Sequence, residues 1–374
     1  MSNLTIRTVQ SKKELKDFIR FVWKINASDP NWIPPLMMDR LRVLDKKKNP
    51  FFKHAEAEYF LAYRNGEIVG RIAAITNQNH NDFHKDHTGF FGFLEGINDP
   101  EVFGALLEEA KKWLKNKGKD YMMGPMNPST NDEIGFLIEG FDTPPYFMMT
   151  HNPPYYNDLM QKLGYEKVKD VFAIYVHRDF FVVSEKLKAV AQATREKFGI
   201  TLRTVRLKNF DEELERVRTV YNNAWSRNWG FVPMTPEEFD FIANDFRRLL
   251  DPELVFLAEI KDRPVGFSLA LPDYNQVFKK ISNGRLFPFG FVTFLTARKK
   301  IDSLRVITLG VVQEFQHAGI GGMFYLETFE RGIKRGYKSA EMSWILEDND
   351  LMLKAATLMG GRKYKTYRIY GTKL

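Results

Sequence analysis

A glycine-rich segment, Gln316–Gly322, constrains the fold of this chain more than any other stretch. The β-branched apolar run Val306–Val312 before it predicts a buried strand, and Phe324–Arg335 after it has the apolar spacing of a helix, with Gly336 in place as a C-terminal cap. A glycine turn between a strand and a helix directs main-chain N–H groups and the positive end of the helix dipole at one point. Because glycine has no Cβ, an anion can approach the backbone closely. The segment therefore predicts a main-chain site for a ligand that carries a pyrophosphate.

Two common phosphate motifs do not fit this segment. A P-loop ends in Gly-Lys-Ser/Thr, which is absent after Gly319. A dinucleotide-binding fingerprint has a different glycine spacing, and it belongs to a βαβ unit with an acidic residue for the ribose. A turn that only reverses the chain is the remaining structural explanation.

The spacing Gln316-x-x-Gly319-x-Gly321 resembles the Q/R-x-x-G-x-G/A turn of the GCN5-related N-acetyltransferase (GNAT) superfamily, whose members bind acyl-coenzyme A. The segments that follow have the order of the second half of a GNAT domain: a strand, Ala340–Leu346, a helix, Asn349–Met359, and a strand, Lys363–Thr372. The resemblance covers roughly residues 201–374. It implies an α/β fold with a mixed sheet.

The first half of the chain repeats this plan. A strand and a helix open it at Leu4–Thr8 and Lys12–Ile25, and Asn65-Gly66 predicts the tight turn of a hairpin. Asn152 to Gly164 and Asn349 to Gly361 both span twelve positions. We therefore expect two tandem acyl-CoA N-acyltransferase-like domains, residues 1–175 and residues 176–374.

The two copies differ at the position of the glycine turn. The first copy has Glu95–Glu101, in which Asp99 is a good helix N-cap and Pro100 a good first helical residue. A carboxylate at a helix N-terminus takes the place of a bound anion and repels a pyrophosphate. We expect that only the second copy binds the cofactor, and that the first has a structural role or forms one wall of the acceptor site.

The resemblance implies a set of cofactor-binding residues. Main-chain groups of Val311 and Val312 would pair with the pantetheine arm, at an edge where neighbouring strands splay apart. Asn349 would contact the cofactor, although Asn is equally suited to be an ordinary N-cap, and His317 fits a solvent-facing loop residue as well. The pyrophosphate would be bound by the turn itself, namely Gln316, His317, Ala318, Gly319, Ile320, Gly321 and Gly322.

Acyl transfer to an amine needs a base for the attacking nitrogen and an acid for the departing thiolate. Many GNAT proteins carry a Tyr seven residues after the Asn, but this chain has Ala356 there. Water or another tyrosine could replace that acid, and Glu341 is an early carboxylate on the same strand as the candidate bases. The predicted catalytic residues are Glu347 and Asp348 as bases and Tyr364 as the acid, with Tyr367 and Tyr370 as alternatives. No nucleophile-elbow pattern appears, which favours direct attack over an acyl-enzyme.

Two further segments are candidates for the acceptor site. Residues 124–154 are rich in Gly, Pro and Asn, and a long irregular segment tends to be functional, although a surface linker has the same composition. Residues 274–301 contain six cations, no acid, and the aromatic run Leu286–Leu295. Such a segment suits a membrane interface or a channel for a long acyl chain. A buried loop that packs on the other half would look similar.

Composition limits the remaining classes of function. The chain has 374 residues, no Cys and a net charge of +8, all of it in residues 176–374. Excess positive charge favours polyanionic coenzyme A, and it also serves solubility. No pattern of a nucleic-acid-binding motif is present, Cys-based metal sites are excluded, and the N-terminal sequence leads us to expect a cytoplasmic protein. The oligomeric state is left open.

The sequence predicts an acyl-CoA-dependent N-acyltransferase that uses no metal and transfers an acetyl group from acetyl-CoA to a primary amine. Two alternatives stay open at this point. The aromatic and cationic segment 274–301 would suit a long-chain acyltransferase that acts on an amine-bearing lipid. Ala356, in place of the family's Tyr, would suit a protein that binds acyl-CoA without turning it over.

Overall fold

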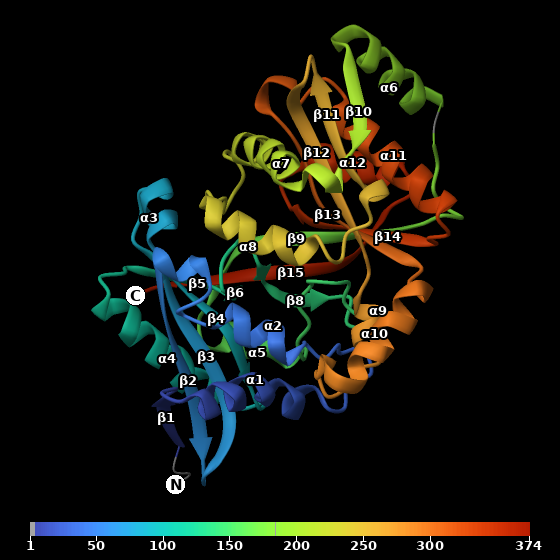
Figure 1. The fold of residues 1–374 in the computed structure, drawn as a ribbon. Helices are drawn as coiled ribbons and strands as arrows, with labels where there is room; N and C mark the ends of the chain where they lie inside the picture. The colour runs from blue at the N-terminus through green and yellow to red at the C-terminus, as the bar shows by residue number, and fades with distance from the viewer. Residues whose placement is uncertain (1–3, 184) are drawn as a thin grey trace. The chain divides into compact units, whose positions relative to one another are not determined.

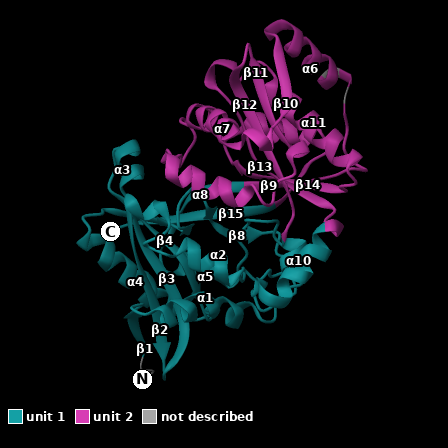
Figure 2. Cartoon of the chain, viewed as in Figure 1, with its two compact units in different colours: residues 1–171, 275–298, 365–374 teal, residues 172–274, 299–364 magenta. Residues whose placement is uncertain are grey.

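The computed structural model describes residues 4–183 and 185–374, which form two compact units (Figures 1 and 2). Unit 1 comprises Met1–Val171, Asn275–Arg298 and Lys365–Leu374. Unit 2 comprises Phe172–Tyr274 and Lys299–Tyr364. Each unit contains strands, helices and its own apolar core.

Unit 1 is a mixed sheet in the order β1-β2-β3-β4-β5-β15, in which β4 and β5 are parallel and the other pairs antiparallel. Helix α4 packs on the sheet at β3, and its buried residues Val102, Phe103 and Leu106 enter the core (Figure 1). The elements are β1 (Leu4–Thr8), α1 (Lys12–Asn26), α2 (Met37–Val43), η1 (Pro50–Lys53), β2 (Ala55–Arg64), β3 (Glu67–Asn77), α3 (Gln78–His84), β4 (Thr88–Gly96), α4 (Pro100–Asn116), β5 (Tyr121–Gly124), β6 (Met126–Asn127), β7 (Glu133–Ile134), β8 (Phe136–Glu139), α5 (Tyr155–Lys162), α9 (Asn275–Phe278), η4 (Leu286–Gly290) and α10 (Phe291–Ala297).

Unit 2 repeats this arrangement in the order β9-β14-β13-β12-β11-β10, with β13 and β14 parallel. Helices α11 and α7 both pack on β12 and β13. The elements are α6 (Glu185–Phe198), β10 (Ile200–Thr204), η2 (Leu207–Asn209), α7 (Phe210–Ala224), α8 (Pro236–Phe246), η3 (Pro252–Leu254), β11 (Val255–Ile260), β12 (Arg263–Pro272), η5 (Arg298–Lys300), β13 (Ser303–Val311), η6 (Gln313–Phe315), α11 (Ile320–Lys334), β14 (Ser339–Leu346) and α12 (Asp350–Leu358). Two long strands, β9 (Glu166–His177) and β15 (Arg362–Lys373), have residues in both units.

The last strand of each half joins the sheet of the other half. Tyr370–Lys373 of β15 pair antiparallel with Tyr121–Gly124 of β5 in unit 1, whereas β9 lies beside β14. Hydrophobic periodicity predicts that such a strand exists but does not name its neighbour. The compact units are defined by packing, and each of them contains segments from both halves of the sequence. The boundary between residues 175 and 176 concerns the sequence repeat and therefore stays a prediction.

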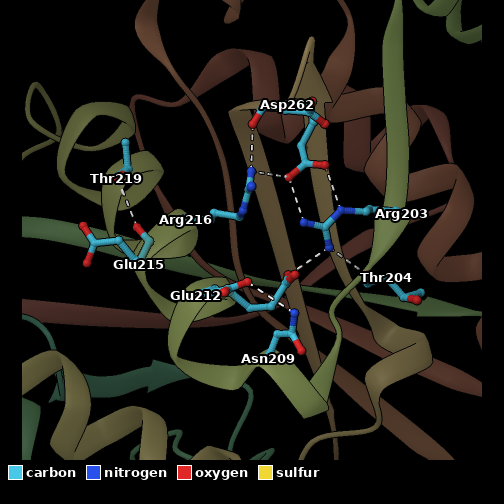
Figure 3. A network of polar contacts seen from close by, with 10 residues as sticks. Arg203, Thr204, Asn209, Glu212, Glu215, Arg216, Thr219 and Asp262 are labelled. Carbon is cyan, nitrogen blue, oxygen red and sulfur yellow. Dashed lines mark hydrogen bonds and ion pairs between the residues drawn. The ribbon is translucent and has the colours of Figure 1, made fainter.

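A buried ion-pair network fixes the start of the second repeat (Figure 3). Arg203 on β10 donates from Nε and Nη2 to the Glu259 carboxylate at 2.7 and 2.8 Å, and from Nη1 to Glu213 at 2.9 Å. Arg216 of α7 donates to the same Glu259 at 2.9 Å. The hydrogen bonds to Glu259 raise the pKa of Arg203 above its usual value. Both carboxylates accept hydrogen bonds from these arginines, and the network thereby joins α7 to β10 and β11.

The segment Asn275–Arg298 packs along one side against the rest of unit 1. Trp23 Nε1 donates to the Ser282 carbonyl at 2.8 Å, and Met37 N donates to the Gly284 carbonyl at 2.9 Å. Gly284 has φ +65°, and a Cβ there would lie 2.6 Å from the Trp23 ring. The expectation of a buried loop is therefore right for this inner side, and wrong for the outer side, where Phe287 and Phe289 are exposed.

Among residues 4–183 and 185–374, no helix is both long enough and apolar enough to cross a bilayer.

Candidate functional site

An open strand edge forms where β13 and β14 separate in unit 2. Their parallel pairing runs from Ser303↔Ser339 to Val306↔Met342, and no further pair follows among the described residues. The other edge of β13 is occupied, because Gly266 of β12 pairs with Val311. Main-chain groups of residues 307–311 that point toward β14 are thus available to an extended ligand. This is the splay that the sequence comparison with GNAT proteins implies.

The glycine turn follows directly at the end of this edge. Gly319 is in the left-handed region, with φ +88°, and is the N-cap of α11. Ala318 N donates to Phe315 O and Gly322 N to Gly319 O. In residues 4–183 and 185–374, no protein acceptor is found for the main-chain N–H groups of His317, Gly319, Ile320 and Gly321. Four donors at a helix N-terminus are a ready site for an anion.

Helix α6 packs behind the turn and was not expected from the sequence. Thr194 Oγ1 donates to the Ala318 carbonyl at 2.7 Å, and a Cβ on Gly319 would lie 3.0 Å from that oxygen. A Cβ on Gly322 would lie 3.2 Å from Leu187 Cδ1. At Gly321 a Cβ would have only an ordinary contact, 3.7 Å to Leu309 Cδ2. Packing thus accounts for two of the glycines and leaves space at Gly321.

The side chains of the turn contribute less to the candidate anion site than its main-chain N–H groups. Gln316 Nε2 donates to the carbonyls of Ala224 at 3.2 Å and Val311 at 3.4 Å, so it braces the turn against α7 and β13. His317 is exposed. Val311 and Val312 are buried as side chains, and Val312 N is already bonded to Val265 O at 2.9 Å.

A buried polar network lies where the two strands begin to separate. Arg305 of β13 lies opposite Glu341 of β14 in the strand pairing, and their side chains are buried, at 2% and 0% exposure. Arg305 Nε donates to Ser343 Oγ at 2.9 Å, and Ser343 Oγ donates to Glu341 Oε1 at 2.5 Å. The Tyr364 hydroxyl donates to Glu341 Oε2. The structure therefore connects a half-buried tyrosine to a buried carboxylate at the apex of the open edge.

Sequence reasoning missed Arg305 and Ser343 as members of this network. An Arg inside the apolar run Ser303–Val311 was the available signal, because a buried strand carries a charge only with a partner. The partner of Arg305 could not be predicted, because the sequence of one strand does not determine its register with a neighbouring parallel strand.

The other candidate residues lie around the end of β14. Glu347 is half-buried and Asp348 is exposed, in the turn between β14 and α12. Asn349 is the N-cap of α12, and its Oδ1 accepts from Met352 N at 3.2 Å. Ala356 is fully buried.

Of the three tyrosines proposed as acids, only Tyr364 is in unit 2 with the glycine turn. Tyr367 and Tyr370 belong to unit 1 and are buried, and the Tyr370 hydroxyl donates to Asn157 Oδ1 at 3.1 Å. In the part of the chain that the structure describes, no group of three or more metal-ligating side chains comes together.

The corresponding groove in unit 1 is filled by the chain itself. Pairing of β4 with β5 ends at Phe90↔Met123, which is the same early separation. There, Asn127 Oδ1 accepts from Phe93 N at 2.7 Å, and a Cβ on Gly92 would lie 1.8 Å from the Met126 carbonyl oxygen. Part of the irregular segment 124–154 thus occupies the edge that unit 2 leaves open.

The helix N-terminus of the first copy is closed as well. Asp99 is the N-cap of α4 and accepts from Glu101 N at 2.8 Å, as the sequence predicts. Arg64 pairs with Asp99 at 2.6 Å and with Glu101 at 2.7 Å. Burial favours the neutral acid, but the hydrogen bonds from Arg64 and the helix N–H groups hold the pKa of Asp99 below its usual value.

Replacing Asp99 should weaken unit 1. We expect Asp99→Ala to lower the free energy of unfolding by about 1–2 kcal/mol through loss of the cap. Asp99→Asn keeps a capping oxygen and loses only the charge toward Arg64, so its loss should be smaller, about 0.5 kcal/mol. Urea unfolding of both variants checks this, and equal losses would contradict a capping role.

Comparisons with known proteins agree over nearly the whole chain. It is 38% identical over 371 residues to "Protein YghO" of Escherichia coli, covering 98% of this chain and 94% of that protein. It is 36% identical over 376 residues to a "Bacterial ceramide synthase" of Caulobacter vibrioides, covering 99% and 97%. No family model matches the chain.

Solved structures share the fold at low sequence identity. A tandem GNAT protein from the clavulanic acid biosynthesis pathway matches with a TM-score of 0.59 at 11% identity, covering 99% of this chain and 98% of that one. A GCN5-related N-acetyltransferase from Sphaerobacter thermophilus matches with a TM-score of 0.55 at 15% identity, covering 99% and 95%. The chain therefore has the fold of tandem GNAT proteins. It belongs to the family that contains Protein YghO and the bacterial ceramide synthase.

Proposed function

We propose that this protein transfers a long acyl group from acyl-coenzyme A to the primary amine of a lipid, and so forms an amide. The observation that carries the proposal is the set of four unbonded N–H groups at the end of an open strand edge in unit 2. Full-length similarity to a protein named bacterial ceramide synthase supports the class of substrate, since a ceramide is an N-acylated long-chain amino alcohol. Acetyl transfer from acetyl-CoA, the first prediction from the sequence, would use the same cofactor site.

The cofactor would lie along β13. Its pyrophosphate would accept from the N–H groups of His317, Gly319, Ile320 and Gly321, with the dipole of α11 adding to the attraction. The pantetheine arm would run back along the open edge from Val311 toward Val306, a path of roughly 17 Å at about 3.3 Å per residue. The thioester would then reach the apex of the edge, beside the network of Glu341 and Tyr364.

The chemistry at that point is direct aminolysis. The amine nitrogen attacks the thioester carbonyl, a C–N bond forms, the C–S bond breaks, and coenzyme A leaves as a thiolate that takes up a proton. We propose Tyr364 as the acid for the thiolate, with Glu341 as the group that positions its hydroxyl. Glu347 and Asp348, in the turn after β14, are the candidate bases for the proton of the amine.

A thiol-release assay tests this function. Purified protein would be given acetyl-CoA, octanoyl-CoA or palmitoyl-CoA, each with a short amine, an amino acid or a long-chain amino alcohol. We expect the highest kcat/KM for palmitoyl-CoA with the long-chain amino alcohol, and mass spectrometry should find the amide. Higher turnover of acetyl-CoA with a short amine would replace this proposal by acetyl transfer. Acyl-CoA binding without thiol release for any amine would leave a binding protein.

A further inference from the structure

The segment 286–297 has one face that the protein does not cover. Phe287, Phe289 and Val292 are 62%, 84% and 61% exposed, and Phe291 and Leu295 are exposed beside them. The rings of Phe287 and Phe291 stack with their centroids 5.4 Å apart. Contiguous exposed aromatic surface of this kind marks an interaction site in a protein.

The exposure of this face does not come from a loosely attached loop. On the inner side of the same segment, Phe278 stacks on Phe294 with ring centroids 6.4 Å apart, and it also contacts Phe147. Asn275 Nδ2 donates to the Pro145 carbonyl at 2.8 Å. With the contacts of Trp23 and Met37 described above, these interactions hold the segment on unit 1 and direct its outer face away from the core.

The charged residues within and next to this segment in sequence are all positive. Between residues 274 and 301 there is no Asp or Glu. The cations are exposed, and among the residues that the structure describes none of them has an ion-pair partner: Lys279, Lys280, Arg285, Arg298, Lys299 and Lys300. Elsewhere in unit 1, cations such as Arg64 and Lys117 do form ion pairs.

We propose that this segment docks on an anionic lipid surface. The exposed side chains of Phe287, Phe289 and Val292 would enter the interfacial layer of the bilayer, and the flanking lysines and arginines would lie among the headgroup phosphates. A second copy of the chain fits less well, because two faces with the same positive charge repel one another. The proposal does not depend on the proposed reaction, since lipid docking needs neither acyl-CoA nor turnover.

Vesicle co-sedimentation tests the proposal on the full-length protein without acyl-CoA. We expect binding to vesicles of equal parts phosphatidylcholine and phosphatidylglycerol, much weaker binding to phosphatidylcholine alone, and loss of binding at high salt. Phe287→Ser with Phe289→Ser should weaken partitioning about 30-fold or more. Lys279→Glu with Lys280→Glu should weaken it by at least about 30-fold at low salt, because two cations are lost and two repelled carboxylates are added.

Matched control variants separate docking from general changes in surface. Leu351→Ser with Leu358→Ser removes two exposed apolar side chains from α12, and Lys12→Glu with Lys13→Glu reverses two charges in the first turn of α1. Both should bind vesicles as the unaltered protein does. The proposal is overturned if the Phe variant binds equally well, or if the unaltered protein binds no vesicles. It is also overturned if light scattering without lipid shows oligomers that only the Phe variant dissociates, because the face would then be a protein interface.

Discussion

Gly321→Glu should reduce the affinity for acyl-coenzyme A by at least about 100-fold and leave the fold intact. Gly321 is the one glycine of the turn with space for a side chain, since a Cβ there would lie 3.7 Å from Leu309 Cδ2. It is the second residue of α11, where a carboxylate is favourable for the helix and occupies the position of an anion. Isothermal titration calorimetry with acetyl-CoA and palmitoyl-CoA measures the loss.

Gly321→Gln is the matched control, because it has the size of Glu without the charge. We expect it to weaken binding far less than Gly321→Glu, and Gly321→Ala to stay within about threefold of the unaltered protein. Gly319 and Gly322 are poorer choices, since a Cβ there crowds Thr194 or Leu187 of α6 and would disturb packing as well. Equal affinity of the Glu and Gln variants would refute the pyrophosphate site at this turn.

Tyr364→Phe should lower kcat by about 10²- to 10⁴-fold, the usual contribution of a positioned acid or base. The KM for acyl-CoA should change little, because the hydroxyl is bonded to Glu341 and not to the glycine turn. If Tyr364 delivers the proton, the variant should also lose one limb of the pH profile of kcat, which a structural role would leave in place. Steady-state kinetics across pH provide both measurements.

Tyr325→Phe is the control for this variant. Its hydroxyl donates to Met352 Sδ at 3.3 Å inside unit 2, so the substitution removes a buried hydroxyl without touching the network. We expect its kcat to stay near that of the unaltered protein. A similar loss in both variants would assign the effect of Tyr364→Phe to stability. Glu341→Gln is a less useful probe of catalysis, because it leaves the buried Arg305 without its charge partner, a change that costs about 3–5 kcal/mol.

If Tyr364→Phe kept full turnover, Tyr364 would not be the acid, and the residues of the turn after β14 would be the remaining candidates for proton transfer. Glu347→Gln and Asp348→Asn would then be the variants to measure, since both residues follow the strand that carries Glu341. The proposed acyl transfer itself would be unaffected by that outcome, because it depends on the glycine turn and the open edge.

The amino-acid sequence by itself determined those elements whose signals are local. The sequence identified the strand β1 at Leu4–Thr8 without error, and the helix of Lys12–Ile25 to within one residue, because apolar spacing and caps are local properties. The turn Gln316–Gly322 was readable for the same reason, since its glycines and the flanking strand and helix are consecutive. Asp99 was readable as an N-cap from its place before Pro100.

Only the tertiary structure decided which parts of the chain meet. Strand β15 completes the sheet of unit 1, and Glu341 lies opposite Arg305 and beside Tyr364, because strand neighbours and register depend on contacts distant in sequence. Residues 126–127 fill the groove of the first copy, while the second copy stays open at β13. The exposure of Phe287 and Phe289 was also decided by the tertiary structure. An aromatic run has the same sequence pattern whether it is buried or exposed, and only the packing around it determines which of the two occurs.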